Sequence, residues 1–177
     1  MNPVKIEKNN LVRARKILEK AENDGRSFLL EPEVYALLKL FGFKVPAHIF
    51  LKNGERLEKD SLRKIKSKEA VVKVVSPLIQ HKSDVGGVAL VKNSSHDIEL
   101  AIKNMKRRVG EAVSRLDKSH KISSAEVEKS IRGFLIVERV DYIQVGFGSE
   151  MLLGLRTSND FGPVVTFGGG GLDVEYL

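Results

Sequence analysis

Two kinds of hydrophobic spacing follow one another along this chain, and their order restricts the folds open to it. Apolar residues recur at helical spacing over residues 11–21 and again over about residues 31–41. A β-branched run at 70–76 indicates a buried strand, and residues 98–116 keep one apolar stripe over several helical turns. From Ile131 onward, strand-like runs punctuated by glycine predict an antiparallel sheet. This succession favours an α/β or α+β fold over an all-α fold.

The ends of these segments carry their own signals. Gly25 follows the first apolar stripe as a stop, Pro32 suits the first turn of the second helix, and Gly42 is placed to take a left-handed cap. Ser94, with Asp97 three residues later, resembles a capping box and predicts the start of the longest helix. Shorter elements are expected at 45–51 and 87–91 (strands) and at 60–66 (helix), with 117–130 as a surface connection.

The composition excludes several classes of protein. An apolar content of 42% over 177 residues is enough to bury a core in one domain or two small lobes. The absence of cysteine rules out disulfides, thiolate metal sites and a cysteine nucleophile. No uncharged run approaches the roughly 20 residues that a bilayer span requires. A cytoplasmic protein without membrane contact is therefore expected.

The net charge of +7 is compatible with nucleic acid, an anionic small ligand or an acidic partner subunit. Nucleic-acid-binding proteins usually add aromatic platforms or a reading motif to a basic patch. Here aromatic residues make up only 6% and no such motif is present. The charged content of 30%, rich in lysine, also fits a protein from a hot environment.

Lys73 lies in the middle of the apolar run at 70–76. A charge there is costly unless it is paired or faces a ligand cleft, and a phosphate group would supply a partner for an ammonium. The alternative is that Lys73 lies on the solvated face of an edge strand. Spacing alone does not choose between the two interpretations.

The connection at 76–87, SPLIQHKSDVGG, carries more chemistry than most loops. A neutral imidazole such as His81 can attack phosphorus, given cationic groups for the phosphate and a carboxylate to fix the tautomer. Lys82 and Asp84 adjoin it, and Gly86 could serve as a hinge. The alternative is an ordinary surface histidine. The remaining histidines lack such neighbours and are interpreted as structural or solvated: His48, His96 and His120.

Two further features are ambiguous on their own. The FGGGG run at 167–171 would let backbone amides approach a phosphate, but it lacks the P-loop pattern, and such a run is more often a flexible turn. Three carboxylates lie in or beside strand-like runs, where they could bind ribose or Mg²⁺ or simply face water: Glu138, Glu150 and Glu175.

Five strings together resemble a known family. LLEPEVYALLKLFGFKVP, AVVKVVSPLIQHKSDVGGVAL, FLIVERV, GSEMLLGLRTSNDFGPVVTFGGGG and VEYL are similar, in this order, to the beta or ATP-grasp part of the nucleoside-diphosphate-forming acyl-CoA synthetases. The resemblance runs from about residue 29 to the last residue. It implies an ATP-grasp fold of two lobes over 29–177, with a small lobe at about 45–130 and a hinge near 138–142, behind an N-terminal helical extension at 1–28.

The resemblance also implies an activity. In this family an acyl-CoA, phosphate and ADP become the free acid, CoA and ATP, through phosphohistidine intermediates. A companion alpha subunit binds CoA, so a hetero-oligomer is implied, with ATP or ADP and Mg²⁺ as cofactors and the acyl substrate and phosphate reached through the partner. By matching position, the implied site residues are His81 as phosphoryl carrier, Lys73, Glu138, Val140, Glu150 and Arg156 at the nucleotide, and Glu175 as a Mg²⁺ ligand. Asp84 is assigned to orienting the histidine loop because it adjoins His81.

Two departures from the family pattern set further expectations. Gly169 stands where the family usually has a larger apolar residue, and the chain stops at Leu177, where the family continues through another strand. The fold is therefore expected to be incomplete at its C-terminus, with an unpaired sheet edge and a metal site short of ligands. An ATP-grasp-like regulatory module without turnover and a basic nucleic-acid-binding protein remain as alternative functions.

Overall fold

The computed structural model describes residues 7–79, 81–116, 122–141 and 150–170 of the chain. They form two compact units that divide between Arg139 and Val140, within the stretch expected to be the hinge. Helices and strands of the first unit are α1 (Lys8–Asn23), α2 (Glu31–Leu40), β1 (His48–Lys52), the 3₁₀ helix η1 (Lys59–Lys64), β2 (Glu69–Val75), β3 (Val88–Lys92), α3 (Ser95–Leu116), α4 (Ser124–Ser130) and β4 (Gly133–Glu138). The second unit contains β5 (Met151–Ser158) and β6 (Gly162–Gly169).

An antiparallel sheet of four strands, in the order β1-β4-β2-β3, forms the centre of the first unit. β4 is the last of these strands in the chain, but it inserts between β1 and β2, with Ile136 opposite both Ile49 and Val72. β2 is therefore an interior strand, hydrogen-bonded to β4 on one side and to β3 on the other. This excludes the edge-strand interpretation of Lys73.

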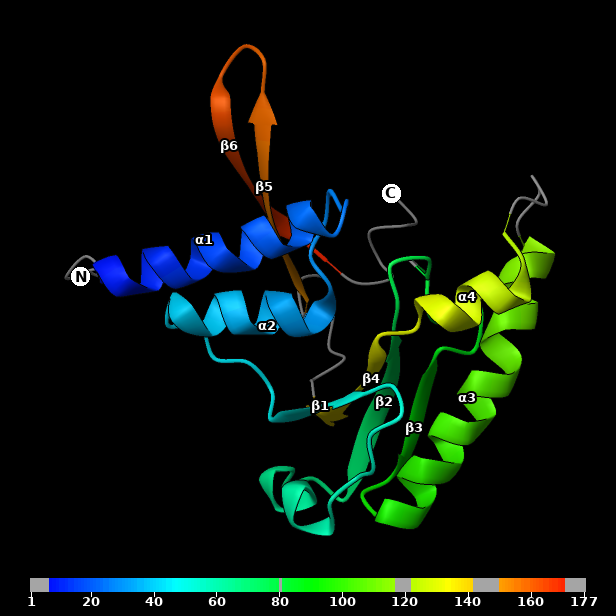
Figure 1. The fold of residues 1–177 in the computed structure, drawn as a ribbon. Coiled ribbons are helices and arrows are strands. Elements are labelled where there is room, and N and C mark those ends of the chain that lie inside the picture. The colour runs from blue at the N-terminus through cyan, green and yellow to red at the C-terminus, as the bar shows by residue number, and fades with distance from the viewer. Residues whose placement is uncertain (1–6, 80, 117–121, 142–149, 171–177) are drawn as a thin grey trace. The chain divides into compact units, whose positions relative to one another are not determined.

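The two faces of the sheet are covered by different helices (Figure 1). On one face Val72, Val74 and Phe134 pack with residues of α3 and α4 in the main core. On the other face Val75, Leu135 and Val137 form a smaller cluster with Leu30 and Tyr35, so α2 is the helix that covers it. Because side chains alternate along a strand, Lys73 faces α2 while Val72 and Val74 face α3.

The signals predicted to end α1 and α2 and to begin α3 are confirmed, whereas the helix expected at 60–66 is the 3₁₀ helix η1. Gly25 and Gly42 follow α1 and α2 with positive φ angles of 70° and 81°, which glycine adopts without strain. At the start of α3, Ser94 Oγ accepts the backbone N–H of Asp97 at 3.1 Å. These local signals succeed because helix ends depend on nearby backbone groups.

α2 is held in place at its N-terminal end by a buried arginine. Arg26 is 7% exposed, and its guanidinium donates to both carboxylate oxygens of Glu33 at 2.8 Å and to Asp24 at 3.0 Å. Glu33 also accepts the backbone N–H of Leu30 at 2.8 Å, which caps the helix. This network fixes the first turn of α2, where Glu31 lies.

The second unit is an antiparallel hairpin of β5 and β6, in which Met151 pairs with Gly169 and Ser158 with Gly162. The expectation of one antiparallel sheet from Ile131 onward was wrong, because β4 belongs to the sheet of the first unit. The reason is visible in its burial: five of the six β4 residues are buried, as in a central strand covered on both faces. β6, in contrast, is mostly exposed.

No helix among the described residues is both long enough and apolar enough to span a membrane.

Candidate functional site

The connection between β2 and β3 is a compact turn closed by backbone hydrogen bonds. Gly87 N–H donates to Lys82 O at 2.7 Å, and Val74 N–H donates to Gly87 O at 2.8 Å. Gly87 admits no side chain here, since a Cβ would lie 2.6 Å from Val74 Cγ1. Gly86 has a positive φ of 69°, as the turn requires. These hydrogen bonds and the two glycines therefore hold residues 81–84 on a turn of fixed backbone geometry, outside the strands of the sheet.

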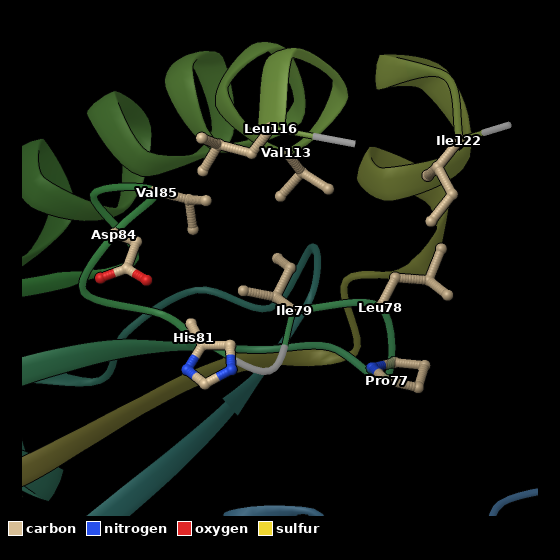
Figure 2. Close-up of a pocket in the computed structure, with 9 residues that line it drawn as sticks. All are labelled: Pro77, Leu78, Ile79, His81, Asp84, Val85, Val113, Leu116 and Ile122. Atoms are coloured by element: carbon tan, nitrogen blue, oxygen red, sulfur yellow. The ribbon is translucent and has the colours of Figure 1, made fainter. Parts of the chain in front are cut away.

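His81 is exposed at this turn and lines a pocket of about 500 Å³. Asp84 lines the same pocket, whose remaining walls are apolar and come from the turn, the end of α3 and the segment before α4 (Figure 2). The structure gives no hydrogen bond between the imidazole and the Asp84 carboxylate. The orienting role of Asp84 therefore stays a prediction, supported by its place in the same pocket.

Lys73 and Lys82 meet at one carboxylate on the α2 side of the sheet. Lys73 Nζ donates to Glu31 Oε1 at 2.6 Å, and Lys82 Nζ donates to Glu31 Oε2 at 3.2 Å. All three side chains are about a fifth to a quarter exposed, at 27%, 23% and 19% for Lys73, Lys82 and Glu31. Burial would raise the pKa of Glu31, but the hydrogen bond and charge of Lys73, together with Lys82, lower it overall.

Lys73 is not among the residues that line the His81 pocket. The His81 pocket opens beside the end of α3, whereas Lys73 faces α2 across the sheet. Lys82 connects the two regions, because it follows His81 in the chain and shares Glu31 with Lys73. The site is thus a histidine on a turn whose next residue belongs to a paired-lysine cluster.

Tyr35 completes the cluster. Its hydroxyl donates to Glu31 Oε1 at 3.4 Å, and its ring lies edge-on to His48 with centroids 4.8 Å apart. His48 is further held by a contact of 2.8 Å between Nδ1 and Pro46 O, which is the structural role expected for it.

A titration of tyrosine absorbance tests this arrangement. Burial, then the charge and hydrogen bond of Glu31, raise the pKa of Tyr35 from 10.0 to about 12. The folded protein therefore holds the phenolic proton more tightly, and this contribution to stability is lost as the pH rises from about 10 to about 12. We expect Glu31→Gln to lower the Tyr35 pKa, with Tyr35→Phe identifying the signal. Ionisation of all tyrosines at the ordinary pKa would contradict the contact.

The other predicted nucleotide contacts are spread over both units. Glu138, at the end of β4, accepts the backbone N–H groups of Lys66 and Ser67 at 2.8 and 3.2 Å, so its carboxylate fastens the segment before β2. Val140 is 58% exposed and begins the second unit. Glu150 is exposed before β5, and Arg156 pairs with Val164 in the β5–β6 ladder. The side chain of Arg156, and all of Glu175, lie outside the described residues.

The described residues contain no group of three or more His, Asp or Glu side chains that could hold a metal ion. Mg²⁺ is commonly bound through one or two carboxylates together with substrate phosphates and water. A single exposed carboxylate such as Glu150 is compatible with that mode of binding, which does not need a preformed cage of protein ligands.

Sequence reasoning missed Glu31 as a site residue. It comes from the first turn of α2, 42 residues before Lys73 and 51 before Lys82. No spacing rule connects such distant positions, because their contact depends on how α2 packs on the sheet. The only signal was the cost of an unpaired charge at Lys73, which requires a partner without saying which.

Comparison with protein families gives a match over residues 20–177 to a family described as "ATP-grasp domain". The chain is 35% identical over 170 residues to an ADP-forming 4-hydroxybutyrate–CoA ligase of Nitrosopumilus maritimus (strain SCM1). The matched region covers 96% of this chain and 22% of that protein. It is 33% identical over 169 residues to subunit beta of the ADP-forming acetate–CoA ligase I of Pyrococcus furiosus. This matched region covers 96% of this chain and 64% of that subunit. The chain thus spans less than two thirds of either relative.

Two solved structures are also similar to this chain. A structure of Ca. Korarchaeum cryptofilum ACD1 in complex with coenzyme A is 28% identical with a TM-score of 0.63, covering 90% of this chain and 60% of that one. The dinucleotide forming acetyl-coenzyme A synthetase 1 of the same organism, in complex with coenzyme A, Ca-AMPCP and HgCl+, is 30% identical with a TM-score of 0.59 and covers 90% and 61%. Both comparisons extend across the two described units.

Proposed function

Because the chain belongs to the ATP-grasp domain family, we propose that it is the nucleotide-binding part of an ADP-forming acyl-CoA synthetase. In this proposal it binds ATP or ADP with Mg²⁺ and passes a phosphoryl group between the nucleotide and His81. The relatives that it resembles include a separate subunit beta as well as longer ligases. A companion CoA-binding alpha part would supply the acyl substrate, so activity is expected only when the two are combined.

One observation supports this function most directly: two lysines from different elements converge beside the turn that carries His81. Amines on a strand and on its following turn form a compact positive site, which suits a polyphosphate. The adjacent imidazole is exposed and lines a pocket, so a phosphate group has access to it. An ordinary surface histidine would not require a paired-lysine cluster at the next residue.

The step assigned to His81 is a direct phosphoryl transfer. A ring nitrogen of the neutral imidazole attacks the γ-phosphorus of ATP, the bond from that phosphorus to the bridging oxygen breaks, and ADP leaves. In the reverse direction a terminal oxygen of ADP attacks the phosphorus of the phosphohistidine, the P–N bond breaks, and ATP and the free imidazole are formed. Lys73 and Lys82 contribute positive charge where the phosphate oxygens lie in the transition state, and Mg²⁺, when bound, neutralises further charge on the nucleotide.

Replacement of Lys73 by methionine tests the nucleotide site. Loss of one charged hydrogen bond to phosphate is expected to weaken ADP binding about tenfold to a hundredfold. Isothermal titration calorimetry with MgADP measures the change. Lys68→Met is a matched control, because Lys68 is an exposed lysine just before β2. Equal affinities of Lys73→Met and the wild-type chain would contradict the proposed site.

The alternative of a regulatory module without turnover makes a different prediction. Such a module would bind nucleotide through the same lysines but would not form phosphohistidine. Binding measurements alone do not separate the two, so transfer to His81 is the deciding experiment.

A further inference from the structure

The carboxylate of Glu31 has no part in the transfer step, yet it occupies the centre of the lysine cluster. We propose that Glu31 is an internal substitute for phosphate: it holds Lys73 and Lys82 in place in the nucleotide-free chain and is exchanged for phosphate oxygens when nucleotide binds. Glu31 is thus a positioning residue that also tethers the His81 turn to α2. The exchange rests on the proposed nucleotide function, whereas the tether does not.

The geometry of the carboxylate supports this role. Each of its oxygens accepts from a different lysine, Oε1 from Lys73 at 2.6 Å and Oε2 from Lys82 at 3.2 Å. Two oxygens of one phosphate group would meet the same two amines in the same way. The three side chains keep between 19% and 27% exposure, so a ligand can reach them without unfolding of the core.

A half-buried site of this kind keeps its charges balanced. Two ammonium groups close together without an anion would repel each other, and partial burial strengthens that repulsion. Glu31 removes this cost in the free chain. An incoming phosphate must displace it, so the carboxylate reduces the apparent affinity for nucleotide.

The same contact couples the cluster to the histidine turn. Lys82 O accepts the N–H of Gly87, which closes the turn, while Lys82 Nζ reaches across to Glu31 on α2. His81 directly precedes Lys82. Exchange of Glu31 for phosphate therefore frees the turn from α2 at the moment when phosphate arrives, and His81 gains the freedom to move toward it.

The test compares Glu31→Gln, Lys82→Met and the double variant, with Glu55→Gln as control. Glu55 forms an exposed ion pair with Lys52 at 3.8 Å, away from the cluster. Hydrogen exchange of peptides covering 77–87 measures the tether, and titrations with MgADP and with inorganic pyrophosphate measure the exchange. Lys82→Met keeps the Glu31–Lys73 pair, so it tests the tether even if Glu31→Gln folds poorly.

We expect amide exchange in the turn to accelerate by about an order of magnitude in either single variant, with no further acceleration in the double variant, since both remove one interaction. We expect Glu31→Gln to bind pyrophosphate and MgADP about threefold to tenfold more tightly, since a competitor is removed. If Glu31 only supported α2, its replacement by glutamine would not strengthen the binding of either anion.

Unchanged exchange in both single variants overturns the tether, and unchanged or weaker pyrophosphate binding by Glu31→Gln overturns the substitution by phosphate. Tighter pyrophosphate binding in a chain that binds no MgADP would support the inference while rejecting the proposed nucleotide function. The two failures are therefore distinguishable.

Discussion

Alanine at position 81 is expected to abolish phosphoryl labelling of the chain. The imidazole of His81 is an exposed nucleophile on the turn between β2 and β3, and its phosphoramidate is acid-labile and base-stable, unlike a phosphate ester of the exposed Ser83 beside it. The measurement is incorporation of label from γ-labelled ATP with Mg²⁺, in the presence of the CoA-binding alpha part of an ADP-forming acyl-CoA synthetase. A loss of at least a thousandfold in rate is expected, on the order of that seen when a catalytic nucleophile is removed.

His96→Ala is the matched control. His96 is also exposed, but it lies in the first turn of α3, away from the lysine cluster. Labelling should be unaffected by its replacement. Label that persists in His81→Ala would place the carrier elsewhere and reject the step, whereas nucleotide binding without any label in the wild-type chain would favour the regulatory module.

Asp84 should affect the same reaction less strongly. Its carboxylate lines the pocket of His81 without a hydrogen bond to the ring in the structure. If it orients the imidazole once phosphate is bound, it acts only through the histidine. These two roles were predicted from the sequence, and the shared pocket is the geometric support for them.

Local features of the fold were predictable from the sequence, because their causes are local. Gly25, Gly42 and the Ser94–Asp97 pair end or begin helices through neighbouring backbone groups, and the structure has each of them in that role. The order of strands was not predictable in the same way. In the sequence, β4 resembles the first strand of a C-terminal meander. In the structure it is buried on both faces, because it lies between β1 and β2 in the middle of the earlier sheet.

The candidate site likewise combines residues that were predictable from the sequence with one that was not. The motif around His81 identified the turn and its chemistry, and Lys73 was recognised as a charge in need of a partner. The partner itself, Glu31, depends on the packing of α2 against the sheet and on the Arg26–Glu33 network that fixes the start of that helix. Neither contact has a sequence period, so the cluster appears only in three dimensions.

The position at which β4 enters the sheet should be the least tolerant of a side chain. Gly133 pairs with Lys52 of β1 and with Val75 of β2, so backbone approaches it from both sides. A Cβ at this position would lie 2.2 Å from Leu51 O and 2.9 Å from Lys52 Cα. Both are backbone atoms, so no rotamer change relieves the overlap, and β1 must move away from β4.

We therefore expect Gly133→Ala to lower the free energy of unfolding by about 4 kcal/mol, which corresponds to roughly 8–16 °C in Tm for a chain of this size. Urea denaturation followed by circular dichroism measures the loss. Gly168→Ala is the control, because it also lies in a strand but a Cβ there meets no atom within 4 Å. Its effect should stay within about 1 kcal/mol. If the two substitutions cost the same, the close approach of β1 to Gly133 is not what limits this position, and the central placement of β4 would lose its strongest energetic support.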